Sequence, residues 1–266
     1  MNNNKEYWAK KEKMSRQAAI HTEYVAQKYA DQIKYSIDNT EVFDDNSDFS
    51  GGSENWKYHT FIRVVADNSE TAIMKSIASH RMAVLNFASY KNPGGMFLKG
   101  STAQEESLCH HSFLYNVLSE KKDFYNWNRK NLNKALYMNR ALYSPDILFY
   151  KDGVYTICDV ITCAAPNKKA AKKYNAVSEL ENEIALFNRI QFVLDMARYK
   201  KVSTLILGAY GCGVFGQDSY RVAGMFRQLL ETKFLGCFEN VIFAIPFSYT
   251  NNNLNNFLTV FEQSLY

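Results

Sequence analysis

The sequence predicts a three-layer α/β fold built around a largely parallel central sheet. From residue 60 onward, short apolar runs of strand length alternate with longer segments of helical periodicity, and short loops join them. The runs at 82–87, 154–164 and 202–207 are almost entirely apolar, as expected for parallel strands buried on both faces. The 47% hydrophobic and 15% aromatic content is ample for a core, which argues against disorder.

The chain is expected to form one domain. Its 266 residues contain no internal repeat, no low-complexity tract and no convincing linker, so a single domain over residues 1–266 is predicted. Residues 5–37 read as one long helix or two joined helices, and residues 1–45 are expected to form a helical N-terminal extension. Apolar side chains recur there at helical spacing among lysines and glutamates: Tyr7, Met14, Ala18, Tyr24, Val25, Tyr29 and Ile33.

Charge and cysteine usage narrow the class of protein only slightly. The net charge of +4 is compatible with an anionic ligand, but ordinary solubility accounts for it as well. The five cysteines form no Cys-x-x-Cys pair, so we expect small core residues in a reducing compartment, without a disulfide framework or a zinc site. No signal peptide or membrane-spanning apolar run is evident, and a cytoplasmic protein is expected.

The remaining elements follow from local signals. The polar stretch 44–55 begins like a calcium loop, but Phe49 stands where glycine is required and Asn55 where the bidentate glutamate belongs, which excludes calcium. Asp152-Gly153 predicts a hairpin turn. Strands are expected at 60–65, 82–87, 147–150, 154–164, 202–207 and 238–245. Helices are expected from Asn68 or Ser69 to about His80, and at 104–120, 178–200, 217–231 and 254–265.

A first candidate site follows the apolar strand 82–87. The chain turns at Asn92-Pro93-Gly94-Gly95, where glycines permit a close backbone approach, and a helix then begins at Gln104-Glu105-Glu106. This order of elements can hold a polar ligand beside an acid. A capping box formed by Thr102 and Glu105 would account for Glu105 structurally, but it does not account for Glu106.

A second candidate site is the glycine loop 208–216. Its Gly-x-Gly-x-x-Gly pattern at 211–216 lies between a strand and a helix, where backbone N–H groups and the helix dipole favour a phosphate. A dinucleotide-binding Rossmann unit is therefore an alternative interpretation of this pattern. Only one clear strand follows this loop, however, and the segment 241–247 ends in Pro-Phe without the required carboxylate.

Together the two loops resemble the microbial poly(ADP-ribose) glycohydrolases, a branch of the macrodomain superfamily. Their signature is a triple glycine, a spacer and Gln-Glu-Glu; here Gly94-Gly95-Met96 precedes a seven-residue spacer and Gln104-Glu105-Glu106. The stretch GAYGCGVFG resembles the family's diphosphate loop, and the apolar strand ending in Ala-Pro-Asn extends the likeness, which covers roughly residues 60–250. The resemblance implies a macrodomain-like three-layer α/β/α sandwich with a mixed, largely parallel central sheet.

The resemblance also implies a function. The protein would cleave ribose–ribose O-glycosidic bonds of poly(ADP-ribose), or a related ADP-ribosyl linkage, without metal or cofactor. A monomer is expected, although the sequence does not determine the oligomeric state. Glu106 would act as the acid–base residue, Glu105 would bind ribose hydroxyls, and Phe215 would orient the distal ribose. The expected substrate-binding residues are Asn86, Asn92, Gly94, Gly95, Met96, Gln104, Gly211, Cys212, Gly213, Val214, Phe215 and Gly216.

Three points stay open in the sequence. A non-catalytic ADP-ribose reader would share the phosphate loop, and an NAD-dependent oxidoreductase is a weaker alternative. Adjacent helical residues point about 100° apart, so Glu105 and Glu106 are expected to be poorly placed to flank one bond. Met96 replaces the third glycine of the signature; if that position needs a positive φ, the methionine adds strain, and its side chain would narrow the distal-ribose site.

Overall fold

The computed structural model describes residues 2–51 and 58–262 of the chain, so part of the predicted polar loop and the end of the last predicted helix lie outside it. Within these residues, seven strands form one sheet in the order β1-β4-β5-β3-β6-β7-β2. The strands are β1 (Glu41–Asp44), β2 (Phe61–Val65), β3 (Arg81–Phe87), β4 (Arg140–Lys151), β5 (Val154–Cys163), β6 (Val202–Leu207) and β7 (Asn240–Ala244). The five strands from β5 to β2 run parallel, whereas β1 and β4 are antiparallel to their neighbours.

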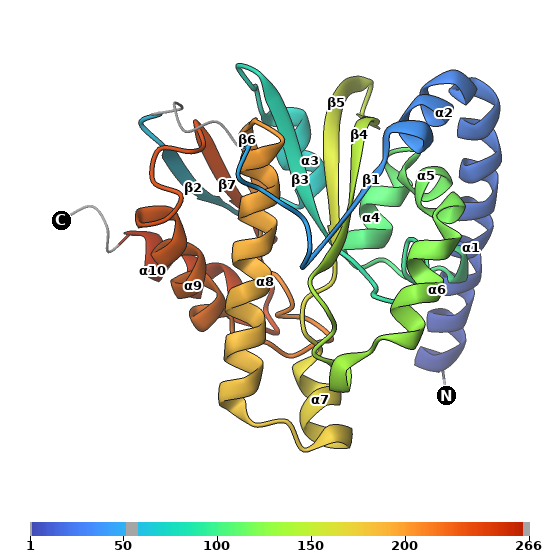
Figure 1. The fold of residues 1–266 in the computed structure, drawn as a ribbon. Helices are drawn as coiled ribbons and strands as arrows, with labels where there is room; N and C mark the ends of the chain where they lie inside the picture. Colours follow the sequence, from blue (N-terminus) through green and yellow to red (C-terminus); the bar gives the residue numbers. More distant parts are fainter. Residues whose placement is uncertain (1, 52–57, 263–266) are drawn as a thin grey trace.

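Helices cover both faces of the sheet, which confirms the three-layer prediction (Figure 1). One face carries α8 (Glu179–Tyr199), α9 (Ser219–Glu231) and α10 (Asn253–Glu262). The other carries α1 (Asn2–Lys28), α2 (Ala30–Asn39), α3 (Ser69–Lys75), α4 (Gln104–His110), α5 (Leu114–Glu120) and α6 (Lys122–Lys130). The helix α7 (Lys168–Asn175) and the 3-10 turns η1 (Phe97–Lys99) and η2 (Asn133–Ala135) lie in the connections.

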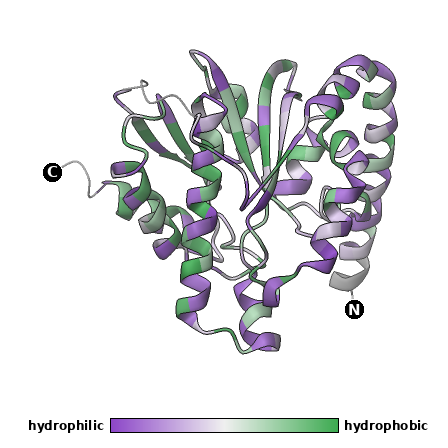
Figure 2. Cartoon of the chain, in the orientation of Figure 1, coloured by the Kyte–Doolittle hydropathy of each residue, from purple (hydrophilic) through white to green (hydrophobic). Residues whose placement is uncertain are grey.

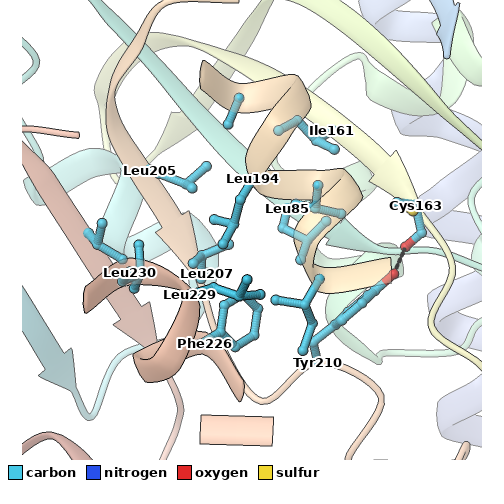
Figure 3. Packing of buried hydrophobic residues seen from close by; sticks show 14 of the residues in the cluster. Leu85, Ile161, Cys163, Leu194, Leu205, Leu207, Tyr210, Phe226, Leu229 and Leu230 are labelled. Carbon is cyan, nitrogen blue, oxygen red and sulfur yellow. Dashed lines mark hydrogen bonds between the residues drawn. The ribbon is translucent and has the colours of Figure 1, made fainter. Parts of the chain in front are cut away.

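Alternating side chains of the central strands build two separate cores. Leu85 of β3 faces the α8–α10 side, whereas its neighbour Val84 faces the α1–α6 side, and both are fully buried. Figure 3 shows the first core, in which Leu205 and Leu207 of β6 pack with residues of α8 and α9. Hydrophobic colouring is accordingly dense in the strands and in α8–α10, while α7 is largely hydrophilic (Figure 2). The apolar runs in the sequence thus correspond to strands buried on both faces.

The predicted N-terminal helices are confirmed as α1 and α2, which join at Tyr29. Most of the expected apolar stripe packs inward, but Tyr7 and Tyr24 are 57% and 50% exposed. The helices α1 and α2 pack against the α5–β4 region with one face only, along which a side chain is buried about every four residues. Tyr7 and Tyr24 lie outside that face. The single-domain organisation stays a prediction.

Several boundaries differ from the prediction. The helix expected over 104–120 is interrupted after His110, where Ser112 pairs with Phe149 in an isolated bridge, so α4 and α5 are separate. The helix capped by Asn68 ends at Lys75 and does not reach His80. The Asp152-Gly153 hairpin turn is confirmed, with φ of 50° and 80° at the two residues. Cys109, Cys158 and Cys163 are buried, as expected of core residues, whereas Cys212 and Cys237 are only partly buried.

The parallel strands end at one edge of the sheet, and both candidate loops leave from that edge. The first follows β3 at Phe87, and the second follows β6 at Leu207. These two strands are hydrogen-bonded neighbours, so loops more than a hundred residues apart in sequence start side by side. No helix within the described residues is both long enough and apolar enough to cross a membrane.

Candidate active site

The turn after β3 brings backbone into direct contact with two carboxyl groups. Gly94 and Gly95 both have positive φ, 61° and 60°. A Cβ atom added at Gly95 would lie 2.6 Å from Glu106 Oε1 and 2.9 Å from Glu105 Oε2. Any other residue would therefore collide with both glutamates, in addition to the cost of its backbone conformation.

The carboxyl groups of Glu105 and Glu106 converge although neighbouring helical residues point apart. Because they lie on the same side of the site, they do not flank a bond between them, in agreement with the expectation. Both carboxyl groups fold back toward the same point above Gly95. They are 3% and 5% exposed, and both lie on one wall of the site. The helix geometry fixes only the Cα–Cβ directions, and the remaining side-chain torsions bring the carboxyl groups together.

Glu105 is held by the end of β3 and the turn that follows. Its Oε2 accepts a hydrogen bond from the Ser89 N–H at 2.7 Å, and its Oε1 accepts one from Asn86 Nδ2 at 3.3 Å. Burial raises the pKa of Glu105 to about 8; the Ser89 N–H opposes this shift, and the adjacent charge of Glu106 adds to it. The pair therefore retains a proton at neutral pH.

The predicted capping box is wrong. The N-cap of α4 is Ala103, and no side chain caps the helix. Glu105 turns away from the helix terminus because the Ser89 N–H and the Asn86 side-chain amide offer it partners, so neither glutamate has a capping role.

Gln104 connects the helix start to the sheet. Its Oε1 accepts the Phe87 N–H at 2.8 Å, while Nε2 donates to Leu85 O at 2.9 Å and to Ser69 Oγ at 3.0 Å. The side-chain amide thus has partners on both of its polar atoms. This arrangement fixes the position from which α4 projects the two glutamates.

Glu106 has a different environment from Glu105. Its Oε1 accepts the Met96 N–H at 2.9 Å, and its other oxygen accepts no hydrogen bond from any residue that the structure describes. The strain predicted for Met96 is absent: its φ is −114°, because the two preceding glycines already complete the left-handed part of the turn. The Met96 side chain is 41% exposed and lines the site, so the predicted narrowing stays a prediction.

The glycine loop after β6 provides the opposite wall. Gly211 and Gly216 have positive φ, 75° and 74°, whereas Gly213 does not, and a Cβ at Gly213 would meet no described atom within 4 Å. Gln217 closes the loop: its N–H donates to Gly211 O at 3.0 Å, and its Nε2 donates to Pro166 O at 2.9 Å. Gln217 was not predicted from the sequence, and the nearby glycine pattern gave no signal for it.

A cavity of about 390 Å³ lies between the two walls. Of the predicted residues it is lined by Gly95, Met96, Gln104, Glu105, Glu106, Gly211, Gly213, Val214 and Phe215. Glu105 and Glu106 are its only carboxylates among the described lining residues. Five predicted residues do not line it: Asn86, Asn92, Gly94, Cys212 and Gly216.

Two of those five residues, Asn86 and Asn92, support the site without lining it. Asn86 is fully buried beneath Glu105, and its Oδ1 has no hydrogen-bond partner in the described part of the chain. Asn92 is exposed and holds the turn through its main chain, with its carbonyl accepting the Gly95 N–H at 3.1 Å. Burial raises the pKa of the Cys212 thiol to about 12, which disfavours the thiolate form at neutral pH.

A second cavity of about 560 Å³ adjoins the first, and sequence reasoning missed it. The two share Phe87, Ala103, Gln104, Ala209 and Gly213. The second adds Ser69 and Glu70 of α3 and the Pro246-Phe247 segment after β7. Glu70 is 2% exposed and accepts a hydrogen bond from Ser107 Oγ at 2.9 Å. The sequence gave no signal for a binding role of Glu70, because an acidic residue in the first turn of a helix is common there simply for its favourable interaction with the helix dipole.

Phe215 packs in an aromatic cluster at the rim of the first cavity. Its ring meets Tyr137 edge-on at 6.1 Å, and Tyr137 stacks on Tyr90 at 4.1 Å. No group of three or more metal-ligating side chains is found among residues 2–51 and 58–262. The expectation that no metal takes part stays a prediction.

The fold and site define a class: an α/β protein that binds its ligand at the carboxyl edge of a parallel sheet, beside two buried carboxyl groups. The family model for the microbial-type poly(ADP-ribose) glycohydrolase (PARG) catalytic domain matches residues 9–152, more than half of the chain. The chain therefore belongs to the microbial-type poly(ADP-ribose) glycohydrolase family, a family of glycoside hydrolases, as the sequence resemblance implied.

Solved structures agree with this assignment. A poly(ADP-ribose) glycohydrolase from Thermomonospora curvata is 27% identical, with a TM-score of 0.85, over 94% of this chain and 99% of that one. A structure of the enzyme from Deinococcus radiodurans in complex with ADP-ribose is 32% identical, with a TM-score of 0.79, over 87% and 98%. A third, from T. curvata with the inhibitor ADP-HPD, is 28% identical, with a TM-score of 0.82, over 96% and 100%. No protein with a curated description matches the sequence significantly.

Proposed function

We propose that this protein hydrolyses the ribose–ribose O-glycosidic bonds of poly(ADP-ribose), or a related ADP-ribosyl linkage, and releases ADP-ribose. The observation that carries the proposal is the environment of Glu106. One of its carboxyl oxygens is fixed by the Met96 N–H, and the other accepts no hydrogen bond from the described part of the chain. Glu106 lies at the cavity that the glycine loop 208–216 lines from the opposite side. An acid–base residue needs one oxygen held in place and one available to the substrate.

The ligand would span both cavities. The glycine loop 208–216 offers backbone to the diphosphate, and the first cavity would hold the distal ribose between Phe215 and the glutamates. The second cavity has room for the adenosine half, where buried Glu70 can accept a hydrogen bond from an exocyclic amine. The related structures that hold ADP-ribose and ADP-HPD support this ligand class.

The chemistry would use Glu106 twice. As the bond between the distal ribose C1 and the leaving ribose oxygen breaks, Glu106 gives that oxygen the proton that the carboxyl pair retains, and the bound diphosphate stabilises the cationic sugar. The resulting carboxylate then takes a proton from water as the water oxygen bonds to C1. No second carboxylate faces this pair across the described lining residues, so one glutamate serves as both acid and base.

Glu105 and Gln104 would have supporting roles. Glu105, whose pKa is raised to about 8, can both donate to and accept from ribose hydroxyls at neutral pH. Gln104 has its amide partners within the protein, so we assign it the positioning of α4. The protein is further proposed to act on the polymer as a cytoplasmic monomer that needs no metal.

The substitution Glu106→Gln tests the proposal. It keeps the shape of the side chain but cannot cycle a proton, so release of ADP-ribose from poly(ADP-ribose) should fall by roughly 10²–10⁴-fold. Calorimetric affinity for ADP-ribose should stay within about threefold, because the glycine loop is untouched. The control is Glu120→Gln, the same change at an exposed position at the end of α5.

Three outcomes separate the alternatives. Near-normal turnover by Glu106→Gln would contradict its role as the catalytic acid. Binding of ADP-ribose without hydrolysis by the unmodified protein would favour the non-catalytic reader. Absence of any saturable ADP-ribose binding up to millimolar concentration would overturn the ligand class itself.

A further inference from the structure

The loop between the glycine turn and the glutamates rests on the N-terminal helix. The 3-10 turn η1 occupies residues 97–99 of this loop, and α1 runs along its outer side. The function proposed above uses neither element, and the sequence gave α1 only a packing role. Their contacts nevertheless lead directly to Glu106.

The inner side of the loop determines where the Met96 N–H points. This N–H is the donor to Glu106 Oε1, and the Met96 carbonyl accepts hydrogen bonds from the N–H groups of Lys99 at 3.0 Å and Ser101 at 3.2 Å. Both the N–H and the carbonyl of Met96 are therefore hydrogen-bonded. A displacement of η1 would move the hydrogen-bond donor of the catalytic carboxyl group.

The outer side of the loop contacts α1 through one side-chain hydrogen bond and one close approach of the two main chains. Ser15 Oγ donates a hydrogen bond to Leu98 O at 2.6 Å. Gly100 has a φ of 74°, and a Cβ there would lie 2.0 Å from Lys11 O and 3.0 Å from Ser15 N. Lys11 and Ser15 are one helical turn apart, so η1 is seated on a single turn of α1.

The Phe97 ring adds a second contact between α1 and the catalytic helix. It is 1% exposed and meets the rings of His21 on α1 at 6.2 Å and His110 on α4 at 4.6 Å. His110 follows Glu106 by four residues, one turn along α4. Phe97 therefore packs between α1 and the helix that carries the glutamates.

The helix α1 is itself anchored beyond this contact. Two hydrogen bonds fix the His21 ring: Nε2 pairs with Ser112 O at 2.8 Å, and Nδ1 pairs with the Tyr150 hydroxyl of β4 at 2.9 Å. Asn116 of α5 donates to Thr22 O at 3.1 Å. The turn of α1 that contacts η1 is thus continuous with a segment attached to the sheet.

We propose that α1 is a positioning element for catalysis. Ser15 and the main chain at Lys11 hold η1, and η1 holds the Met96 N–H against Glu106. Ser15 is a positioning residue, since it does not touch the cavity. The inference rests on the acid–base role proposed for Glu106, and it assigns the N-terminal extension to the active site.

The substitution Gly100→Ala is the principal test, with Gly153→Ala as its matched control. Both glycines are left-handed, with φ of 74° and 80°, so both variants have the same kind of backbone cost. A Cβ at Gly153 meets no described atom within 4 Å, whereas at Gly100 it must displace η1 from α1. We expect kcat to fall at least about tenfold in Gly100→Ala alone, with ADP-ribose affinity within about threefold.

A milder pair separates positioning from folding. Ser15→Ala removes one hydrogen bond and should lower kcat by about fivefold, while Ser15→Thr keeps the hydroxyl and should restore it. KM should change little in either variant, since the cavity walls are intact. Amide hydrogen exchange of the peptide that contains Met96, measured without substrate, should be faster in Ser15→Ala and Gly100→Ala only.

The exchange measurement keeps this inference separate from the proposed function. The unmodified protein could prove inactive on every ADP-ribosyl substrate while the variants still show faster exchange at Met96. That result would support the positioning of the Met96 N–H by α1 and η1, and it would refute only the proposed catalytic function. An active enzyme whose kcat and Met96 exchange are unchanged by Gly100→Ala would overturn the inference alone. Equal losses of kcat in Gly100→Ala and Gly153→Ala would also overturn it, because both would then report general destabilisation.

Discussion

The two walls of the first cavity are built by opposite means. In the carboxylate wall, formed by the turn 92–96 and the start of α4, Glu105 accepts hydrogen bonds from Asn86 of β3 and from the Ser89 N–H just after it, Glu106 accepts one from the Met96 N–H, and both are almost fully buried. In the phosphate wall, the loop 208–216, the main chain faces the cavity, and the Val214 side chain is 81% exposed. One wall is packed around side chains, and the other is left open for a ligand.

The glycines make the same contrast. At Gly95 the missing side chain makes room for the protein's own carboxyl groups, whereas at Gly213 it leaves empty space at the cavity surface. Proton transfer needs a carboxyl group fixed within a few tenths of an ångström, and such precision requires packed partners. Binding of a diphosphate needs several N–H groups within hydrogen-bond distance of its oxygens, and bare backbone provides them. The difference between the walls therefore follows from the two tasks proposed for them.

Gly95→Ala should give the largest effect on this comparison. The added methyl group would collide with Glu105 and Glu106 and would also strain a backbone with φ of 60°. Hydrolysis of poly(ADP-ribose) should fall on the order of 10³-fold, since both carboxyl groups must move. Turnover and thermal midpoint are measured beside Gly153→Ala, which has the strain without the collision. Retention of more than a tenth of the activity would show that the carboxylate wall adapts.

Glu105→Gln should change the pH dependence of stability. The folded-state pKa of Glu105, about 8, lies above its ordinary value of 4.5, so the folded state binds more protons between these values. The free energy of unfolding of the unmodified protein should therefore fall as pH rises from about 4.5 to 8 and then level off. Glutamine has no such titration, and the unpaired Oδ1 of Asn86 can accept its amide proton after a rotation of the Asn86 amide.

Urea unfolding at pH 5, 6.5 and 8 measures this effect. From pH 5 to pH 8, the free energy of unfolding of Glu105→Gln should rise by roughly 2–3 kcal/mol relative to that of the unmodified protein. This value is smaller than the full pKa shift would give. Glu120→Gln, at an exposed position, provides the baseline. A pH-independent difference between Glu105→Gln and the unmodified protein would show that Glu105 is ionised throughout this range.

Gly213→Ala should give the smallest effect, and it should act on the ligand alone. Gly213 has an ordinary backbone conformation, and its Cβ would meet no described atom within 4 Å, so the thermal midpoint should be unchanged. The methyl group would face the cavity, and affinity for ADP-ribose should fall by about tenfold, or about 1.4 kcal/mol. Calorimetry with ADP-ribose checks this value. An unchanged affinity would mean that the diphosphate does not approach the loop at Gly213.

Local structure was largely predictable because local forces determine it. The strand 82–87, the strand 202–207 and the hairpin at Asp152-Gly153 were all found from apolar runs and turn residues. The helix 178–200 was also found, but Leu180 and Ile184 in its first two turns are 66% and 53% exposed, although their apolar side chains suit a buried face. The first turns of this helix extend toward α7 and beyond the end of the sheet, so their apolar side chains have no sheet to pack against (Figure 1).

The sequence by itself determined the family, the three-layer fold and the two loops, since their glycines and glutamates are contiguous in the chain. Only the tertiary structure decided how Glu105 and Glu106 are used. A capping box and a buried carboxyl pair have the same sequence, and partners on β3 and the glycine turn select between them. The second cavity and the contact of α1 with η1 were likewise invisible, because they join segments distant in sequence. Such contacts depend on how the layers pack, which no local pattern records.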